Sequence, residues 1–246
     1  MAIYKGNKQI KAIYRGATPI TKLYRGSLLV FGGDAPTPPT PPTPEYGPMR
    51  LVCKATGDTA NFKLYLSRYS STSVENLPIV DGIIDFEVGS EYVGISLKQT
   101  PTITEVLHLP QLNYITMESL VQNTQCTNVN FDGVSTPNLI TLRFAFGGLT
   151  TLTTLDLSPL DVSNLADIAG CFSRCTNLQS LNLSTWGELD KVTTAYYKQD
   201  VFEDCNSLTH IKCKTAFRDW CWANASVLSL PAAMQEGGSG TWELTD

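Results

Sequence analysis

The sequence predicts an α/β solenoid with a β-rich N-terminal cap, joined by a proline-rich linker to a small N-terminal β-meander. Three patterns support this fold class. A decapeptide occurs three times in the first 33 residues, seven of the fourteen prolines lie between residues 34 and 48, and the spacing L-x-x-L-x-L recurs further along the chain. We therefore expect four segments, at residues 1–33, 34–48, 49–102 and 103–246.

The decapeptide repeat consists of Tyr, a basic residue and Gly, followed by an apolar residue. Its three copies place these residues at Tyr4, Lys5 and Gly6, then at Tyr14, Arg15 and Gly16, and finally at Tyr24, Arg25 and Gly26. Short runs of Ile, Tyr and Leu lie between the glycines, and glycine favours turns. The repeat therefore predicts a β-meander that turns at each glycine.

Residues 1–33 carry six basic residues and no Asp or Glu, although the whole chain has a net charge of −5. Segments shorter than about 40 residues seldom bury enough apolar surface to be stable alone. We therefore expect this segment to anchor to a larger partner, with the positive charge assisting recruitment. The alternative is a small cationic cap that folds against the C-terminal part of the same chain.

The segment DAPTPPTPPTPEYGP, residues 34–48, favours polyproline II. At about 3.1 Å per residue, the stretch 35–44 would hold its ends roughly 30 Å apart. Such a strut suits an anchor that is separated from the domain it carries. A ligand for an SH3-like module is the competing interpretation, but the prolines lack a flanking basic residue.

The composition restricts the classes of function. With 42% hydrophobic and 17% charged residues, the chain is typical of a soluble globular protein, and the acidic C-terminal part argues against nucleic-acid binding. No apolar run is long enough to predict membrane insertion. Charges recur through the first 25 residues, so we expect no secretory signal.

A longer repeat follows the linker. The spacing L-x-x-L-x-L occurs at residues 152–157 and 178–183 and, with substitutions, at 208–213, while residues 103–108 fit loosely. Measured between strand starts, the units are residues 103–128, 129–151, 152–177 and 178–207. Repeats of this length predict a solenoid in which each coil covers the apolar side of its neighbour.

The seven cysteines are better explained as buried thiols than as a metal site or a disulfide framework. Cys175 and Cys205 stand three residues before a strand leucine, where another unit has Leu149. A position that accepts either Leu or Cys is a core position. Metal binding by Cys171 and Cys175 is the alternative, but a third ligand is not apparent. We predict no metal and no cofactor.

The stretch LTTLDLSPLDVSNLADIAGCFSRCTNLQSLNLS, residues 152–184, resembles the BspA-like class of leucine-rich repeats. The match is close there and loose over residues 103–213. The resemblance implies a leucine-rich-repeat solenoid. It also implies binding and not catalysis, because members are adhesive surface proteins of bacteria and related phage proteins.

The ends of such a repeat array need caps. Alternating runs in residues 49–102 predict a β-rich N-terminal cap, and Trp220, Trp222 and Trp242 offer bulk to close the last coil. Trp220 and Trp222 could instead bind the face of a sugar. With two histidines and scattered carboxylates, no catalytic constellation is apparent, so we do not predict an enzyme.

The N-terminal repeats also resemble short Tyr-x-Gly decapeptides at the start of structural proteins of tailed bacteriophages. This resemblance implies a virion protein, a head fibre or tail appendage, anchored to a capsid or tail protein through residues 1–33. The repeat domain would bind a host-surface glycan or protein, and fibres of this kind are commonly homo-oligomers. The alternative is a bacterial surface or scaffold protein that binds a protein partner.

The candidate contact loop is an insertion in the last repeat unit. The repeat alignment places Ala195 opposite Ile168, and a four-residue insertion, Tyr196 to Gln199, follows it and contains Tyr196, Tyr197 and Lys198. Length differences between repeats tend to map to loops on one face, which is often the binding face. We therefore expect these three residues to contact the ligand.

Overall fold

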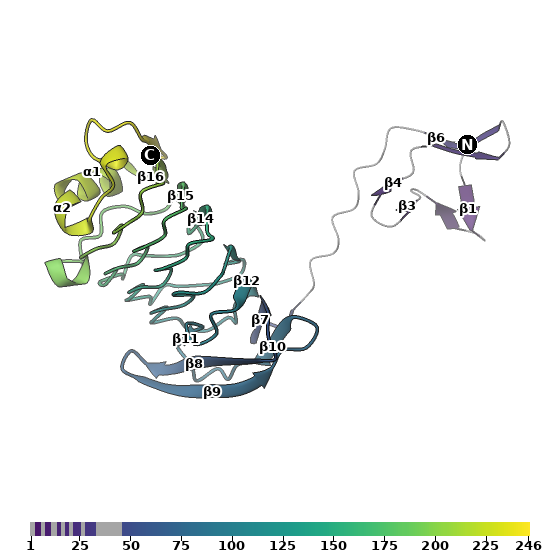
Figure 1. Cartoon of the computed structure of the whole chain (residues 1–246), viewed down its shortest axis with the longest axis horizontal. Helices are drawn as coiled ribbons and strands as arrows, with labels where there is room; N and C mark the ends of the chain where they lie inside the picture. Colours follow the sequence, from purple (N-terminus) through teal and green to yellow (C-terminus); the bar gives the residue numbers. More distant parts are fainter. Residues whose placement is uncertain are drawn as a thin grey trace. The chain divides into compact units, whose positions relative to one another are not determined.

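A computed structural model of the chain describes residues 46–246 in full and, within residues 1–45, only the backbone of six short strands. The chain divides into two compact units, Met1–Glu45 and Tyr46–Asp246. Both are drawn in Figure 1. Gly6, Gly16 and Gly26 and most of the predicted linker, residues 33–45, lie outside the described residues.

The N-terminal unit contains three antiparallel hairpins, one for each decapeptide. They pair β1 (Ile3–Lys5) with β2 (Lys8–Ile10), β3 (Tyr14–Arg15) with β4 (Thr18–Pro19), and β5 (Lys22–Arg25) with β6 (Leu28–Gly32). A meander would also pair strands of neighbouring repeats. Among the described strands all pairing is within a repeat, so the predicted single meander is wrong and three separate two-stranded sheets replace it.

The second unit begins with two sheets. One has the order β10-β7-β12-β13 and the other the order β11-β8-β9. Their bounds are β7 (Arg50–Ala55), β8 (Thr59–Ser67), β9 (Ser70–Pro78), β10 (Ile83–Glu87), β11 (Gly94–Ser96), β12 (Ile103–His108) and β13 (Asn128–Val129). Strand β12 pairs antiparallel with β7 and parallel with β13, so it joins the antiparallel start to a parallel stack.

The third sheet of this unit is parallel. It consists of β14 (Thr154–Asp156), β15 (Ser180–Leu183), β16 (His210–Cys213) and β17 (Thr241–Leu244), which lie side by side along one edge of the stack (Figure 1). Leu155, Leu181 and Ile211 are paired in register. Leu155 and Leu181 are leucines of the sequence repeat, and Ile211 takes the equivalent position. All three side chains are buried.

The return segments between these strands are also hydrogen bonded from one coil to the next. The amides of Leu142, Phe144 and Phe146 donate to carbonyls 25 residues further along, at 2.9–3.0 Å. The amides of Ile168, Gly170 and Phe172 do the same with the following coil, at residues 197, 199 and 201. Each coil is therefore fixed to its neighbours on two sides.

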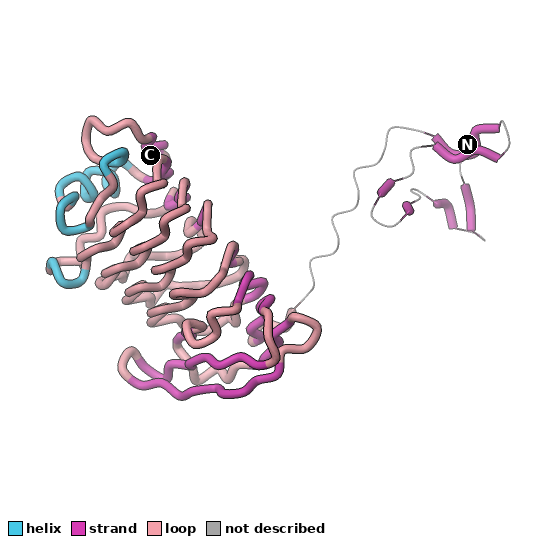
Figure 2. The backbone as a smooth tube through the Cα atoms, viewed as in Figure 1, coloured by secondary structure: helices cyan, strands magenta, loops and turns pink. Residues whose placement is uncertain are grey.

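The predicted α/β leucine-rich-repeat solenoid is wrong as a fold class, because residues 46–246 are mostly β, with three sheets and two short α-helices. The helices α1 (Thr215–Ala223) and α2 (Ala225–Leu228) lie together near the C-terminus, while the returns are turns and bends (Figure 2). The physical reason is the inter-coil hydrogen bonding, which uses the amides that a helix would bond to its own carbonyls.

The core of the second unit is continuous from Leu51 to Met234, so residues 49–102 and 103–246 share it. A column of phenyl rings forms its centre. Phe146 stacks on Phe172 at a centroid distance of 5.8 Å, and Phe172 stacks on Phe202 at 5.6 Å. The aligned rings explain why phenylalanine recurs once per coil, since each ring covers the next.

The C-terminal segments cover the last coil. Trp220 is buried in α1, and the indole nitrogens of Trp222 and Trp242 both donate to the carbonyl of Met234 at 3.1 Å. Met234 ends the 3₁₀ helix η2 (Ala232–Met234). No helix in the part of the chain described by the structure is long and apolar enough to cross a membrane.

All seven cysteines are free thiols with buried side chains. Burial raises the pKa of Cys126 to about 11 and that of Cys213 to about 12. The thiols of Cys175 and Cys205 instead lie 3.0 and 2.9 Å from the carbonyls of Phe146 and Phe172. They hydrogen bond one coil to the previous coil.

We predict that Cys126 and Cys213 resist alkylation by iodoacetamide near pH 8 in the folded chain and react fully in urea, because their reactive thiolates are scarce while the pKa stays high. Because the folded-state pKa is raised, stability is unaffected below the ordinary value of 9.0 and is lost progressively as the pH rises from there through the folded-state pKa. The free energy of unfolding should therefore fall by about 1–3 kcal/mol per thiol between pH 9 and 11. A Cys126→Ala variant should show a shallower fall, and rapid alkylation of the folded chain would contradict the account.

Candidate binding face

Two of the three predicted contact residues, Tyr196 and Tyr197, lie on one short 3₁₀ helix, and Lys198 follows it. This helix, η1 (Ala195–Tyr197), overlaps the expected insertion only in part. The amide of Ile168 donates to the carbonyl of Tyr197 at 2.8 Å. Tyr197 therefore takes the position in its coil that Asp167 takes in the preceding coil. The repeat alignment had placed Ala195 opposite Ile168. That alignment is wrong, because the additional residues of this coil lie before Lys198 and not after Ala195.

The two tyrosines of η1 differ in exposure. Tyr196 is 60% exposed, and the guanidinium carbon of Arg143 lies 4.5 Å from the centre of its ring. Tyr197 packs partly against the core, with Arg68 at 6.0 Å from its ring centre. The ammonium of Lys198 lies 5.7 Å from the ring of Trp220. The insertion therefore presents one exposed ring, and the other two side chains are engaged internally.

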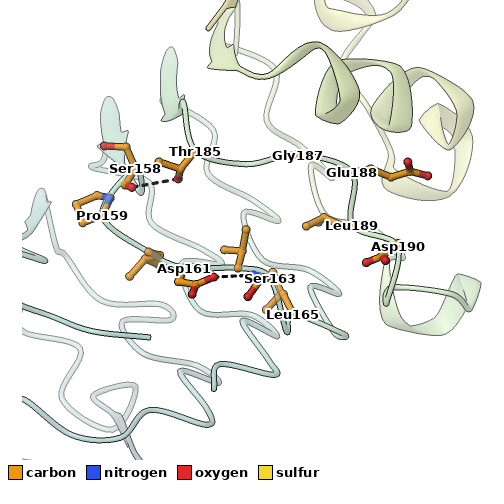
Figure 3. A pocket seen from close by; sticks show the side chains of 12 residues that line it. Ser158, Pro159, Asp161, Ser163, Leu165, Thr185, Gly187, Glu188, Leu189 and Asp190 are labelled. Carbon is orange, nitrogen blue, oxygen red and sulfur yellow. Dashed lines mark hydrogen bonds between the residues drawn. The ribbon is translucent and has the colours of Figure 1, made fainter. Parts of the chain in front are cut away.

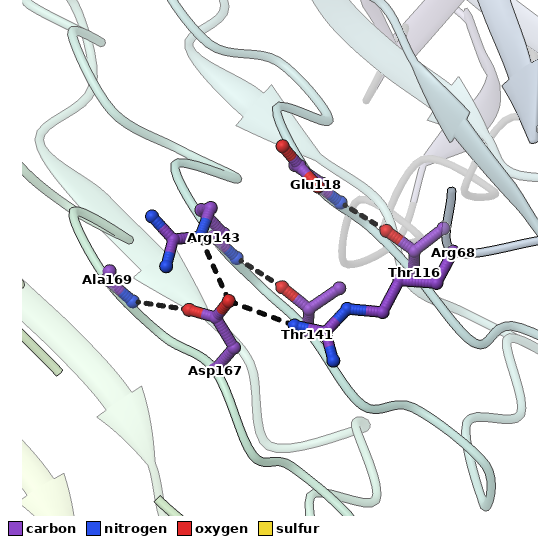
Figure 4. A network of polar contacts seen from close by, with 7 residues as sticks. All are labelled: Arg68, Thr116, Glu118, Thr141, Arg143, Asp167 and Ala169. Atoms are coloured by element: carbon purple, nitrogen blue, oxygen red, sulfur yellow. Dashed lines mark hydrogen bonds and ion pairs between the residues drawn. The ribbon is translucent and has the colours of Figure 1, made fainter. Parts of the chain in front are cut away.

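A buried carboxylate pairs with the two arginines that contact these tyrosines (Figure 4 shows the ion pairs). Oδ2 of Asp167, whose side chain is 2% exposed, lies 2.9 Å from Nε of Arg143 and 3.1 Å from Nη2 of Arg68. Oδ1 accepts a hydrogen bond from the amide of Ala169 at 3.2 Å. We call Arg68, Arg143, Asp167, Tyr196 and Tyr197 the arginine–tyrosine cluster.

This cluster joins segments that are distant in sequence. Arg68 occupies the turn between β8 and β9, and its partner Asp167 is 99 residues further along. Because two guanidinium groups share one carboxylate, the ionic core has a net charge of +1. Nη2 of Arg143 is buried and has no hydrogen-bond partner among the described residues. A buried charge of this kind is costly unless it is paired, so Asp167 is needed to hold both arginines.

Asp167 replaces a threonine found in the preceding coils. Thr116, Thr141 and Asp167 form a column of parallel bridges, and each side chain accepts a hydrogen bond from the amide two residues later. The local turn is therefore the same in all three coils. The carboxylate keeps this bond and adds the ion pairs, which a threonine cannot make.

A groove next to the cluster is lined mainly by amide, carboxylate and glycine residues, and we call it the amide groove. Its volume is about 420 Å³. The lining residues are Gln122, Asn123, Phe144, Gly147, Gly148, Gly170, Ser173, Arg174, Gln199, Asp200 and Glu203. Phe144 follows Arg143, and Gln199 follows Lys198, so the amide groove and the cluster are adjacent along the same coils.

Glycines shape the floor of the amide groove. Gly170 has φ +60°, and a Cβ there would overlap the ring of Phe144. Gly148 has φ +74°, and a Cβ there would overlap the side-chain amide of Asn123. Both positions therefore require glycine for its conformation and for space. The phenyl ring and the amide can then lie directly over the backbone of the adjacent coil.

A second groove, of about 600 Å³, lies between residues 158–165 and 185–190 (Figure 3). Asp161 lies on one side, and Glu188 and Asp190 lie on the other. The amide of Ser163 and then its hydroxyl hold the pKa of Asp161 below its ordinary value. No group of three metal-ligating side chains suited to a metal ion occurs in the described part of the chain. Without a cation or an aromatic ring in its lining, this groove offers little for specific recognition.

The structure brings together part of what the sequence predicted. Tyr196, Tyr197 and Lys198 are adjacent, whereas Arg68, Arg143, Asp167 and Phe144 were not predicted. Asp167 could have been predicted from the repeat alignment, because it is a charged residue at the position that Thr141 occupies in the preceding unit. Arg68 has no comparable signal, because only folding places its hairpin there. Of the predicted anchor residues, Lys5, Arg15 and Arg25 end the first strands of the three hairpins.

We predict that Asp167→Asn lowers the free energy of unfolding by about 3–5 kcal/mol, because it leaves Arg143 buried without a counter-charge. Arg68→Ala should cost only about 1 kcal/mol, since Asp167 retains Arg143 and Arg68 is partly exposed. Asp132→Asn, at an exposed site, is the matched control and should change stability by less than about 0.5 kcal/mol. Urea unfolding measures all three, and equal midpoints for Asp167→Asn and the control would refute this role of Asp167.

No family model, curated protein or solved structure matches this chain in the three comparisons made. The resemblances to BspA-like repeats and to tailed-phage decapeptides therefore stay predictions.

Proposed function

We propose that this chain is a structural protein of a tailed-bacteriophage virion, a head fibre or tail appendage. Residues 1–33 would anchor it to a capsid or tail protein, and residues 46–246 would attach to a host-surface glycan or protein. The observation that carries this proposal is the division into two compact units of opposite charge. Residues 1–33 carry +6, whereas residues 46–246 contain 12 basic and 21 acidic residues, a net charge of −9.

The hairpins support an anchoring role through their repetition. In each, the basic residue that ends the first strand pairs with the residue that begins the second, as Lys5↔Lys8, Arg15↔Thr18 and Arg25↔Leu28. Three copies of one hairpin provide three equivalent contacts to a partner of opposite charge. Linked contacts bind far more tightly than single ones, because the second binding event becomes intramolecular.

The binding face supports an attachment role through its surface chemistry. Tyr196 presents an exposed ring held over Arg143, and aromatic residues and arginine are enriched among residues that dominate binding energy. The buried ion pairs beneath it fix the arginines in place, so little order is lost on binding. Several copies on one particle, or a homo-oligomer, would convert weak contacts into firm attachment.

The anchoring part is tested by locating the chain in a lysate of infected cells. We expect the full chain to co-purify with phage particles at a fixed ratio to the capsid protein, and a chain lacking residues 1–33 to remain in the supernatant. Quantitative mass spectrometry of the particle band measures both. Recovery of the full chain in the cell envelope or cytosol, and not in particles, would overturn the proposal and favour a bacterial surface or scaffold protein.

The attachment part predicts that Tyr196→Ala weakens binding of the full chain to host cells at least about tenfold, because it removes the exposed ring. The melting temperature should change little, since this side chain is 60% exposed. Tyr197 is unsuitable for this test because it packs against the core. Val80→Ala, at an apolar side chain that is 62% exposed and outside the arginine–tyrosine cluster, provides the control, and an equal loss of binding in the control would contradict a specific role for Tyr196.

A further inference from the structure

Most backbone amides beneath the amide groove are already used by the stack. The amides of Asn123, Gly148 and Gly170 donate to carbonyls of the next coil at 2.7–2.9 Å, and the amide of Arg174 does so at 2.6 Å. A peptide strand binds mainly through main-chain hydrogen bonds at an exposed sheet edge. The amide groove offers no such edge, so the side chains of the groove must recognise the ligand.

The side chains of the groove supply both donors and acceptors. The amides of Asn123 and Gln199 make no hydrogen bond to other residues that the structure describes. Asp200 accepts a bond from Ser229 at 3.1 Å, and Glu203 accepts one from Ser173 at 2.9 Å, each through one oxygen. Each carboxylate therefore keeps a second oxygen for a ligand. Adjacent donors and acceptors of this kind suit neighbouring hydroxyl groups.

The net charge of the amide groove restricts the class of ligand that it can bind. Two carboxylates and the guanidinium of Arg174, whose side chain is 70% exposed, give the groove a net charge of −1. The cationic neighbour Arg143 is only 14% exposed and covered by Tyr196, so it does not offset this charge at the groove surface. An anionic ligand would be repelled, whereas a neutral polyhydroxyl compound would not.

The aromatic ring in the amide groove restricts the shape of the ligand. The ring of Phe144 lies over Gly170 and is partly exposed, so it provides a flat apolar surface among polar groups. One face of a pyranose ring carries C–H groups that pack on such a surface, while its hydroxyls point outward. The volume of about 420 Å³ lies within the range of small-molecule sites.

We infer that the amide groove binds a neutral saccharide, with a sugar ring over Phe144 and its hydroxyls bonded to Asn123, Gln199, Asp200 and Glu203. This inference rests on the proposed attachment function and names its ligand class. An open groove with one aromatic ring should bind weakly, with a Kd on the order of millimolar. Weak binding at one site is compatible with attachment through many copies.

Saturation-transfer NMR on the full chain tests the inference, with cellobiose, maltose and lactose as neutral probes and glucuronic acid as the anionic probe. At least one neutral disaccharide should receive saturation at its ring C–H protons. Phe144→Leu should weaken binding about tenfold or more, because the flat ring is lost. Gln199→Ala should weaken it as well without affecting the core, whereas Gln125→Ala, at an exposed glutamine outside the groove, should have no effect.

Three results would overturn the inference: no transfer to any neutral probe, preferential binding of glucuronic acid, or an equal loss with Gln125→Ala. Its failure is separable from failure of the proposed function. Loss of cell binding in Tyr196→Ala but not in Phe144→Leu would retain attachment and exclude the saccharide groove. Saccharide binding by a chain that is absent from particles would retain the groove and exclude the virion role.

Discussion

Stacking of each coil on the next is the interaction on which the compact unit depends. A single coil has an apolar side that its own residues cannot cover, and the next coil supplies the cover through rings such as Phe146, Phe172 and Phe202. Inter-coil hydrogen bonds fix the register on two sides. The same register builds the binding face, because Arg143, Asp167 and Tyr197 come from consecutive coils.

The spacing of leucines predicted where the strands β14, β15 and β16 lie, since the leucine positions are buried in each of them, but not that they form a parallel sheet in a mostly β fold. It did not predict how the chain returns between strands. A return bearing Ile168 and Phe172 on one face fits a helix by periodicity. Its amides nevertheless bond to the next coil, and residues with positive φ, such as Phe144 and Arg174, interrupt any helix. Periodicity reports which side chains are buried and not where the amides bond.

The site was predictable to the extent that it is local. An insertion in one repeat identified η1, because unequal repeat lengths are visible in the sequence. The partners of η1 were not visible, since Arg68 reaches Asp167 from 99 residues away and depends on how the β8–β9 hairpin packs. The amide groove likewise combines four coils, and its glycines have a clear role only once Phe144 and Asn123 are seen to cover them.

The central claim is that residues 46–246 form a self-sufficient unit, while the N-terminal hairpins serve an external partner. Light scattering combined with urea unfolding, on the full chain and on a chain that starts at Tyr46, tests it most directly. The account predicts the same unfolding midpoint for both chains, a monomeric shortened chain, and self-association of the full chain in the absence of its partner. A shortened chain of lower stability would contradict it and make the hairpins a cap of their own chain, and a full chain that is monomeric would contradict the role of the hairpins in association.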